Sequence, residues 1–154
     1  MEAKVPETGE AIARRWLPAV VEGLAKYADV EQQMNILGLC GQACGKHDLE
    51  ELSRIKQQAR DETELLDLIN DRVPWCGTWV REFDHIRSVC SSCGCPLVRE
   101  YGLELSPTFC LCSRGWVRAT FSQAFDREVE VDLVKAIGRG DDCCEFVVRL
   151  GAGK

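Results

Sequence analysis

The chain has 154 residues, of which 45% are hydrophobic and 29% are charged, which is the composition of a globular domain with a proper core. The formal net charge of -6 argues against a nucleic-acid partner, because such binding depends mostly on Lys and Arg. No apolar run approaches the roughly 18 residues that a membrane helix needs, and residues 1–10 are polar. We therefore expect a cytoplasmic protein without a signal peptide.

We expect a single domain over residues 1–154, with a mainly helical half over 1–74. Ile12, Trp16, Val20 and Leu24 recur at a spacing of four, which predicts one apolar helix face, with Pro18 as a kink or a break. Asp29 and Gln32 form a capping box for a second helix that ends near Gly45. Two further helices are expected behind caps at Asp48 and Asp61, the last one stopped by Pro74.

The second half, residues 75–154, is cysteine-rich and ends in a predicted hairpin. A helix is expected over 114–125. Apolar residues alternate with polar ones over 129–133 and again over 144–150, on either side of a turn at 138–142. This alternation places Cys144 on the core face and Cys143 on the opposite face. The predicted fold class is α+β, with N-terminal helices packed on a C-terminal antiparallel sheet or hairpin and a cysteine-rich central segment.

Ten cysteines are far more than ordinary usage. In a reducing cytoplasm they are expected to bind a metal or to be reactive, and not to form structural disulfides. The central string Cys90-Ser91-Ser92-Cys93-Gly94-Cys95 is followed by Cys110-Leu111-Cys112. Paired cysteines of this kind can hold a tetrahedral zinc ion with sulfur ligands at about 2.3 Å, and backbone N–H groups of the turns would stabilise the thiolates.

The chain has more thiols than one metal ion needs, so the set of ligands and the kind of metal are not decided by the spacing. Zinc held by Cys90, Cys93, Cys110 and Cys112 leaves Cys95 as a further ligand or a separate reactive thiol, with Cys144 able to approach from the hairpin. An iron–sulfur cluster also uses four cysteines. Cys40 and Cys44 share a helix face and are additional candidate ligands. The plain alternative is that these residues are small, buried and apolar, and packing is the preferred role for Cys76.

Candidate catalytic groups are few. His85 could serve as a metal ligand or as a general base oriented by Asp84 or Glu82. Cys95 and Cys143 are the candidate nucleophiles, although no convincing base lies near either of them in the sequence.

The last third of the chain resembles a known pattern. Cys110-x-Cys112, the helix over 114–125 and the ending Gly140-Asp141-Asp142-Cys143-Cys144-Glu145-Phe146 look like the 4-vinyl reductase domain superfamily. Its members include small-molecule sensor domains of phenol-responsive regulators. The neighbouring L-2-amino-thiazoline-4-carboxylate hydrolase-like family shares a similar tail. The resemblance covers roughly residues 85 to 150.

The resemblance implies an α+β ligand-binding fold and a zinc ion held by cysteines. The matching positions are Cys110 (or Cys112) and Cys144. Two further ligands of the sensor pattern are missing, because the corresponding stretch is Leu133-Val134-Lys135-Ala136. Cys90, Cys93 and Cys95 could replace them in a relocated site.

Three functions follow as expectations. The first is a cysteine-coordinated metal-binding protein that senses or carries a small molecule, with a homodimer as a possible assembly. The second is a hydrolase of a cyclic C–N bond, implied by the resemblance. The third is an iron–sulfur redox protein.

Overall fold

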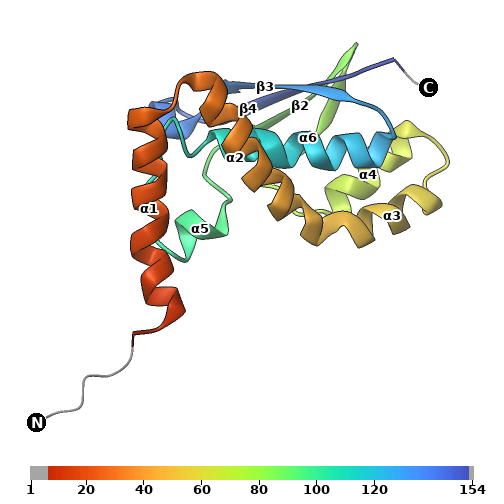
Figure 1. Cartoon of the computed structure of the whole chain (residues 1–154). Helices are drawn as coiled ribbons and strands as arrows, with labels where there is room; N and C mark the ends of the chain where they lie inside the picture. Colours follow the sequence, from red (N-terminus) through yellow and green to blue (C-terminus); the bar gives the residue numbers. More distant parts are fainter. Residues whose placement is uncertain (1–6, 153–154) are drawn as a thin grey trace, which may run out of the picture.

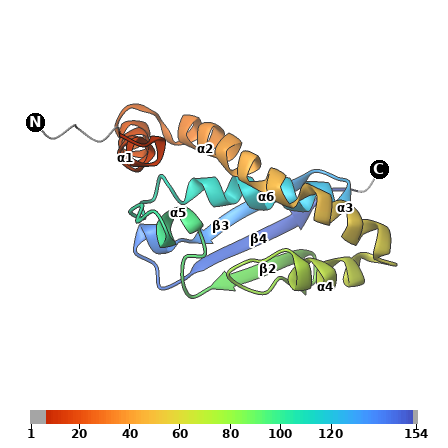
Figure 2. The same cartoon turned by 90° about the horizontal axis from the view of Figure 1, so that it is seen from below.

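The computed structural model describes residues 7–152 and confirms the α+β class. A four-stranded antiparallel sheet has the order β1-β2-β4-β3. Its strands are β1 (Val80–Glu82), β2 (His85–Cys90), β3 (Val129–Lys135) and β4 (Cys144–Leu150). The predicted C-terminal hairpin is β3–β4, whereas the β1–β2 pair was not predicted. The helices lie on one face of the sheet (Figures 1 and 2).

The helical half begins with α1 (Gly9–Tyr27) and α2 (Val30–Gly45), whose capping box at Asp29 is present as predicted. Pro18 lies inside α1 without ending it. A short 3-10 turn, η1 (Lys46–Asp48), leads directly into α3 (Leu49–Gln58), so the predicted cap at Asp48 is wrong: its side chain makes no capping hydrogen bond. Asp61 does cap α4 (Glu62–Arg72).

Two helices belong to the second half. The one-turn α5 (Pro96–Arg99) follows the Cys93–Cys95 loop, and α6 (Leu111–Phe125) covers the sheet. A 3-10 turn, η2 (Ile137–Arg139), connects β3 to β4. No helix in residues 7–152 combines the length and the apolar character required to cross a bilayer.

Aromatic rings fill the space between α6 and the sheet. Trp79, Phe121 and Phe146 are almost fully buried. Trp75 stacks on Trp79 and on Trp116, with ring centroids 5.5 Å and 4.6 Å apart. Burial of this much aromatic surface stabilises the sheet–helix layer. By contrast, the predicted apolar face of α1 is largely uncovered, since Ile12, Trp16 and Val20 are all exposed.

Helices α2 and α6 approach each other through glycines. An added Cβ at Gly41 would lie 2.6 Å from the backbone nitrogen of Trp116, and one at Gly115 would lie 2.6 Å from Cα of Gly38. Only residues without a side chain allow this contact, so the two backbones touch.

We predict that Gly41→Ala destabilises the protein, because the new methyl group would press into the α6 backbone and overpack the contact by about 1–3 kcal/mol. Gly38→Ala is the matched control on the same helix. It meets nothing within 4 Å, so it should stabilise by up to about 1 kcal/mol through helix propensity. Urea unfolding midpoints measure both effects, and equal midpoints for the two variants would contradict the packing.

Candidate thiol site

Cysteines from four parts of the chain meet at one end of the sheet. β2 ends at Cys90 where β4 begins at Cys144, because these two residues are register partners. Cys110 is the residue before α6, and Cys95 is the residue before α5. Strands and helices that begin or end at this end of the sheet therefore bring their cysteines together.

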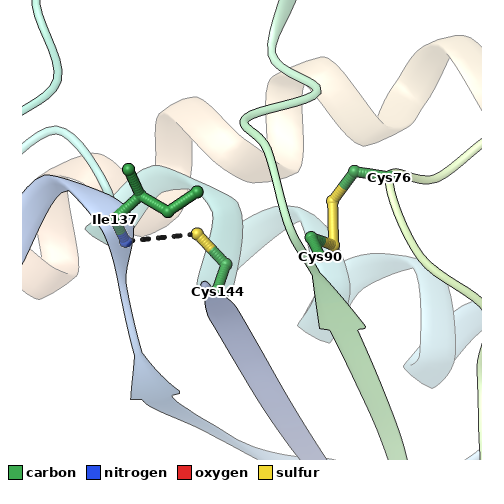
Figure 3. The surroundings of a disulfide bond; sticks show 4 residues. All are labelled: Cys76, Cys90, Ile137 and Cys144. Atoms are coloured by element: carbon green, nitrogen blue, oxygen red, sulfur yellow. Dashed lines mark hydrogen bonds between the residues drawn. A yellow bond between two sulfur atoms is a disulfide. The ribbon is translucent and has the colours of Figure 1, made fainter. Parts of the chain in front are cut away.

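Backbone groups lie close to the thiols of Cys144, Cys110 and Cys93. The amide of Ile137 lies 3.5 Å from Sγ of Cys144 (Figure 3). Burial raises the pKa of Cys110 and of Cys93, and the backbone groups of Gly138 and Cys95 offset part of that rise. Such donors stabilise a thiolate more than a thiol, because the hydrogen bond is stronger to a charged acceptor.

Gly138 is required for this arrangement. An added Cβ at this position would lie 2.5 Å from Sγ of Cys110 and 2.7 Å from the carbonyl oxygen of Ser106. The glycine of the predicted turn thus serves to let η2 approach the sulfur closely.

The same three thiols lie within electrostatic range of one another. Burial raises the pKa of Cys110, and the thiols of Cys144 and Cys93 raise it further. Burial likewise raises the pKa of Cys93, with Cys95 and Cys144 as contributing neighbours. Cys93, Cys110 and Cys144, with Cys95 beside them, are called the hairpin thiols below.

The disulfide corrects one prediction. Cys76 and Cys90 are bonded, with their Cα atoms 5.3 Å apart (Figure 3). An added Cβ at Gly77 would lie 2.8 Å from Oγ of Ser88, so the segment after Cys76 runs directly against β2. Cys90 in this form is not a thiolate donor, and the expectation that the cysteines form no disulfide is wrong. Disulfides are rare in cytoplasmic proteins, so the Cys76–Cys90 bond gives no support to the expected cytoplasmic location, which stays a prediction.

Metal ligation itself stays a prediction. Within residues 7–152, no three Cys, His, Asp or Glu side chains are preassembled as a metal site. The donor chemistry nevertheless fits a thiophilic cation, because Cys93, Cys110 and Cys144 lie near one another and the Ile137 amide faces Cys144.

The structure does not bring His85 to the cysteine end of the sheet. His85 is at the opposite end of β2 from Cys90, roughly 16 Å along the strand. Its Nδ1 contacts Asp84 at 3.1 Å and its Nε2 contacts Glu82 at 3.4 Å, as the sequence suggested. Burial and a hydrogen bond with Asp142 raise the pKa of Cys143, which keeps that thiol protonated and weakly nucleophilic at neutral pH.

A cleft lies beside the hairpin thiols. The side chains of Arg114 and Arg139 line this cleft. The positive charge of Arg139 also offsets part of the raised pKa of Cys110. The lining is completed by Met34, Leu111, Asp132, Leu133 and Val134. The Asp132 carboxylate is paired with Arg149, so the guanidinium groups determine the charge of the cleft. The sequence analysis missed both arginines because they are far apart in the chain.

A model of the family described as "Family of unknown function (DUF6144)" matches residues 5–151. The chain belongs to the DUF6144 family. The comparison with curated proteins found no match.

Solved structures share the fold of this DUF6144 protein at low sequence identity. One is the phenol-responsive sensory domain of the transcription activator PoxR with phenol, at 13% identity and a TM-score of 0.61. It covers 89% of this chain and 74% of that one. A second is a trafficking protein particle complex subunit 3 from Naegleria fowleri covalently bound to palmitic acid. It has 18% identity and a TM-score of 0.58, and the match covers 93% of this chain and 95% of that chain.

A third is an H-NOX protein from S. oneidensis in the Fe(II)NO ligation state, at 16% identity, with a TM-score of 0.54 and coverages of 99% and 83%. These likenesses establish the fold alone. They agree with the predicted resemblance to a phenol-sensor fold, but the 4-vinyl reductase superfamily itself is not confirmed.

We predict that the denatured DUF6144 protein, purified without reductant under nitrogen, shows eight reactive thiols out of ten cysteines, because Cys76 and Cys90 are bonded. Thiol titration after metal removal measures this number. Reduction before denaturation should raise the count to ten. A count of ten without reduction would show that the disulfide is absent.

Proposed function

We propose that this DUF6144 protein is a zinc-binding domain of the sensor or carrier type, with zinc held by Cys93, Cys110, Cys144 and Cys95. The observation that carries the proposal is the approach of the η2 backbone to two thiols: the amide of Ile137 lies 3.5 Å from Sγ of Cys144, and Gly138 lies against Sγ of Cys110. Amide donors of this kind orient and stabilise coordinating groups from outside the ligand shell.

The pattern of charges supports a cation at this place. Burial, and to a lesser degree the neighbouring thiols, raises the pKa of Cys110 and of Cys93, which keeps these two thiols neutral in the absence of a metal. A bound cation would reverse this effect, since metal ligation releases the thiol protons. Four thiolate ligands match the closed coordination of a structural zinc site.

An iron–sulfur cluster is the second candidate for the same thiols, because it also requires four cysteines. Zinc is preferred because a closed tetrahedral zinc site takes four ligands from separate segments, here the Cys93–Cys95 loop, the residue before α6 and the start of β4. Colour separates the two, since iron–sulfur clusters absorb visible light.

The cleft beside the thiols supports small-molecule binding. Arg114 and Arg139 would pair with a carboxylate, and Met34, Leu111 and Leu133 would contact an apolar body. We therefore propose small organic acids as the ligand class. A homodimer is also proposed, and the exposed side chains of Ile12 and Trp16 on α1 are the surface it would cover.

We predict that protein purified without oxygen is colourless and contains zinc, and that Cys110→Ser/Cys144→Ser lacks one equivalent of it. Loss of a metal whose free concentration is 100 times its Kd lowers the free energy of unfolding by about 2.7 kcal/mol. This corresponds to a decrease in Tm of roughly 5–10 °C for a protein of this size. Elemental analysis and thermal unfolding measure the two effects.

Cys143→Ser is the matched control and should keep the full zinc content, because Cys143 lies outside the hairpin thiols. Chelator-treated wild type should unfold at the temperature of the double variant. Wild-type zinc content in the double variant, or a brown protein with iron and sulfide, would refute the zinc assignment.

We predict that benzoate raises Tm by roughly 3–6 °C at ten times its Kd, whereas neutral phenol does so less. The benzoate effect should vanish in Arg139→Gln and persist in Arg54→Gln, which alters a guanidinium on α3 that pairs with Glu50 and Glu51. Equal shifts in both variants would show that the cleft is not the binding site.

A further inference from the structure

The Cys76–Cys90 disulfide lies beside a free thiol on the neighbouring strand. Cys90 and Cys144 are register partners in the antiparallel pair of β2 and β4. Residues directly opposite each other in such a pair have Cα atoms about 4.5–5.5 Å apart and side chains on the same face of the sheet. Cys144 is a free cysteine, and Figure 3 shows it at the strand end next to that of Cys90.

The shared face is the one that the helices cover. Ser88 and Cys90 are buried on β2, and Phe146, the register partner of Ser88, is buried on β4. Cys144 lies two residues before Phe146 and therefore on the same face. A disulfide spans Cα separations of about 4.4–6.8 Å, so the register spacing of Cys90 and Cys144 allows a bond like the one that Cys90 forms with Cys76.

The two halves of the existing disulfide differ in access. Cys90 is completely buried, with an exposed fraction of 0%, whereas Cys76 is at an exposed position. The protein thus shields Cys90 from thiols in solution, while Cys144 approaches it from within the sheet. Sγ of Cys144 accepts the Ile137 amide at 3.5 Å. This contact favours the thiolate, which is the form that attacks a disulfide.

We propose that Cys144 exchanges with Cys76 as the disulfide partner of Cys90. The Cys144 thiolate attacks Sγ of Cys90, so a bond forms between these two sulfur atoms and the bond between Cys90 and Cys76 breaks. Cys76 leaves as a thiolate and takes up the proton that Cys144 has lost. The step requires no oxidant or reductant, because one disulfide is present before and after it.

The exchange changes which segments are tied together. The resting bond joins the segment before β1 to β2, whereas the exchanged bond joins β2 to β4. An added Cβ at Gly94 would lie 3.0 Å from Cβ of Cys76, so release of Cys76 removes a support of the Cys93–Cys95 loop. The exchange also withdraws Cys144 from the hairpin thiols. Only this last effect, on the metal, rests on the proposed function.

The test is peptide mapping of metal-free protein, incubated under nitrogen at mildly alkaline pH and then treated with N-ethylmaleimide to block free thiols. Trypsin places Cys76 in residues 73–81, Cys90 in 88–99 and Cys144 in 140–149. We expect 88–99 linked to 140–149 in addition to 73–81 linked to 88–99. The new pair should be lost in Cys144→Ser and kept in Cys143→Ser, the matched control in the same peptide.

A further variant isolates the new bond. In Cys76→Ser the resting disulfide cannot form, and oxidised glutathione should link Cys90 to Cys144. Absence of the new pair in wild type, or a bond within residues 88–99 in Cys76→Ser, would overturn the exchange and leave the zinc proposal intact. Added zinc should suppress the exchange in wild type. Exchange at an unchanged rate would confirm the disulfide chemistry and count against zinc at Cys144.

Discussion

The close contact of α2 with α6 is the constraint on which the thiol arrangement depends. Gly41 and Gly115 allow the two backbones to touch, and α6 in turn packs on the sheet through Phe121. This layering fixes the start of α6 above the edge where β2 ends and β4 begins. Cys110 and Cys112, at that start, consequently lie between the hairpin on one side and the Cys40–Cys44 turn on the other. A wider helix crossing would move the start of α6, and with it Cys110, away from the hairpin.

Electrostatics explains why so many thiols at one edge point to a cation. Buried thiols remain protonated, and each neighbouring thiol makes ionisation of the next more costly. The amide of Ile137 nevertheless faces Cys144, where it stabilises negative charge, and the backbone of Gly138 offsets part of the raised pKa of Cys110. The thiophilic ion that we propose would satisfy both features. Cys76 and Cys90 have a different role, because they form a disulfide. Their bond joins the segment before β1 to the end of β2. Gly94 lies against Cys76, so the disulfide also positions the Cys93–Cys95 loop.

Local signals predicted the fold class, the capping box at Asp29, the cap at Asp61 and the β3–β4 hairpin, because each is encoded in neighbouring residues. Cys144 was correctly assigned to the core face by strand alternation. The short β1–β2 pair was missed because three residues carry almost no periodicity. The Cys76–Cys90 bond could not be predicted, since it depends on the path of the chain between Pro74 and β1. The cap at Asp48 failed because η1 continues directly into α3. Which candidate thiols meet at one end of the sheet depends on strand register and on the α2–α6 crossing, which no local pattern reveals.

The most direct measurement is X-ray absorption at the zinc edge on protein purified without oxygen. The account predicts a first shell of sulfur alone, close to four per zinc at about 2.3 Å. In Cys110→Ser/Cys144→Ser, the signal of the hairpin site should disappear. A shell of nitrogen and oxygen at about 2.0 Å, or protein without metal, would contradict the central claim that the cysteines of this DUF6144 protein bind a metal.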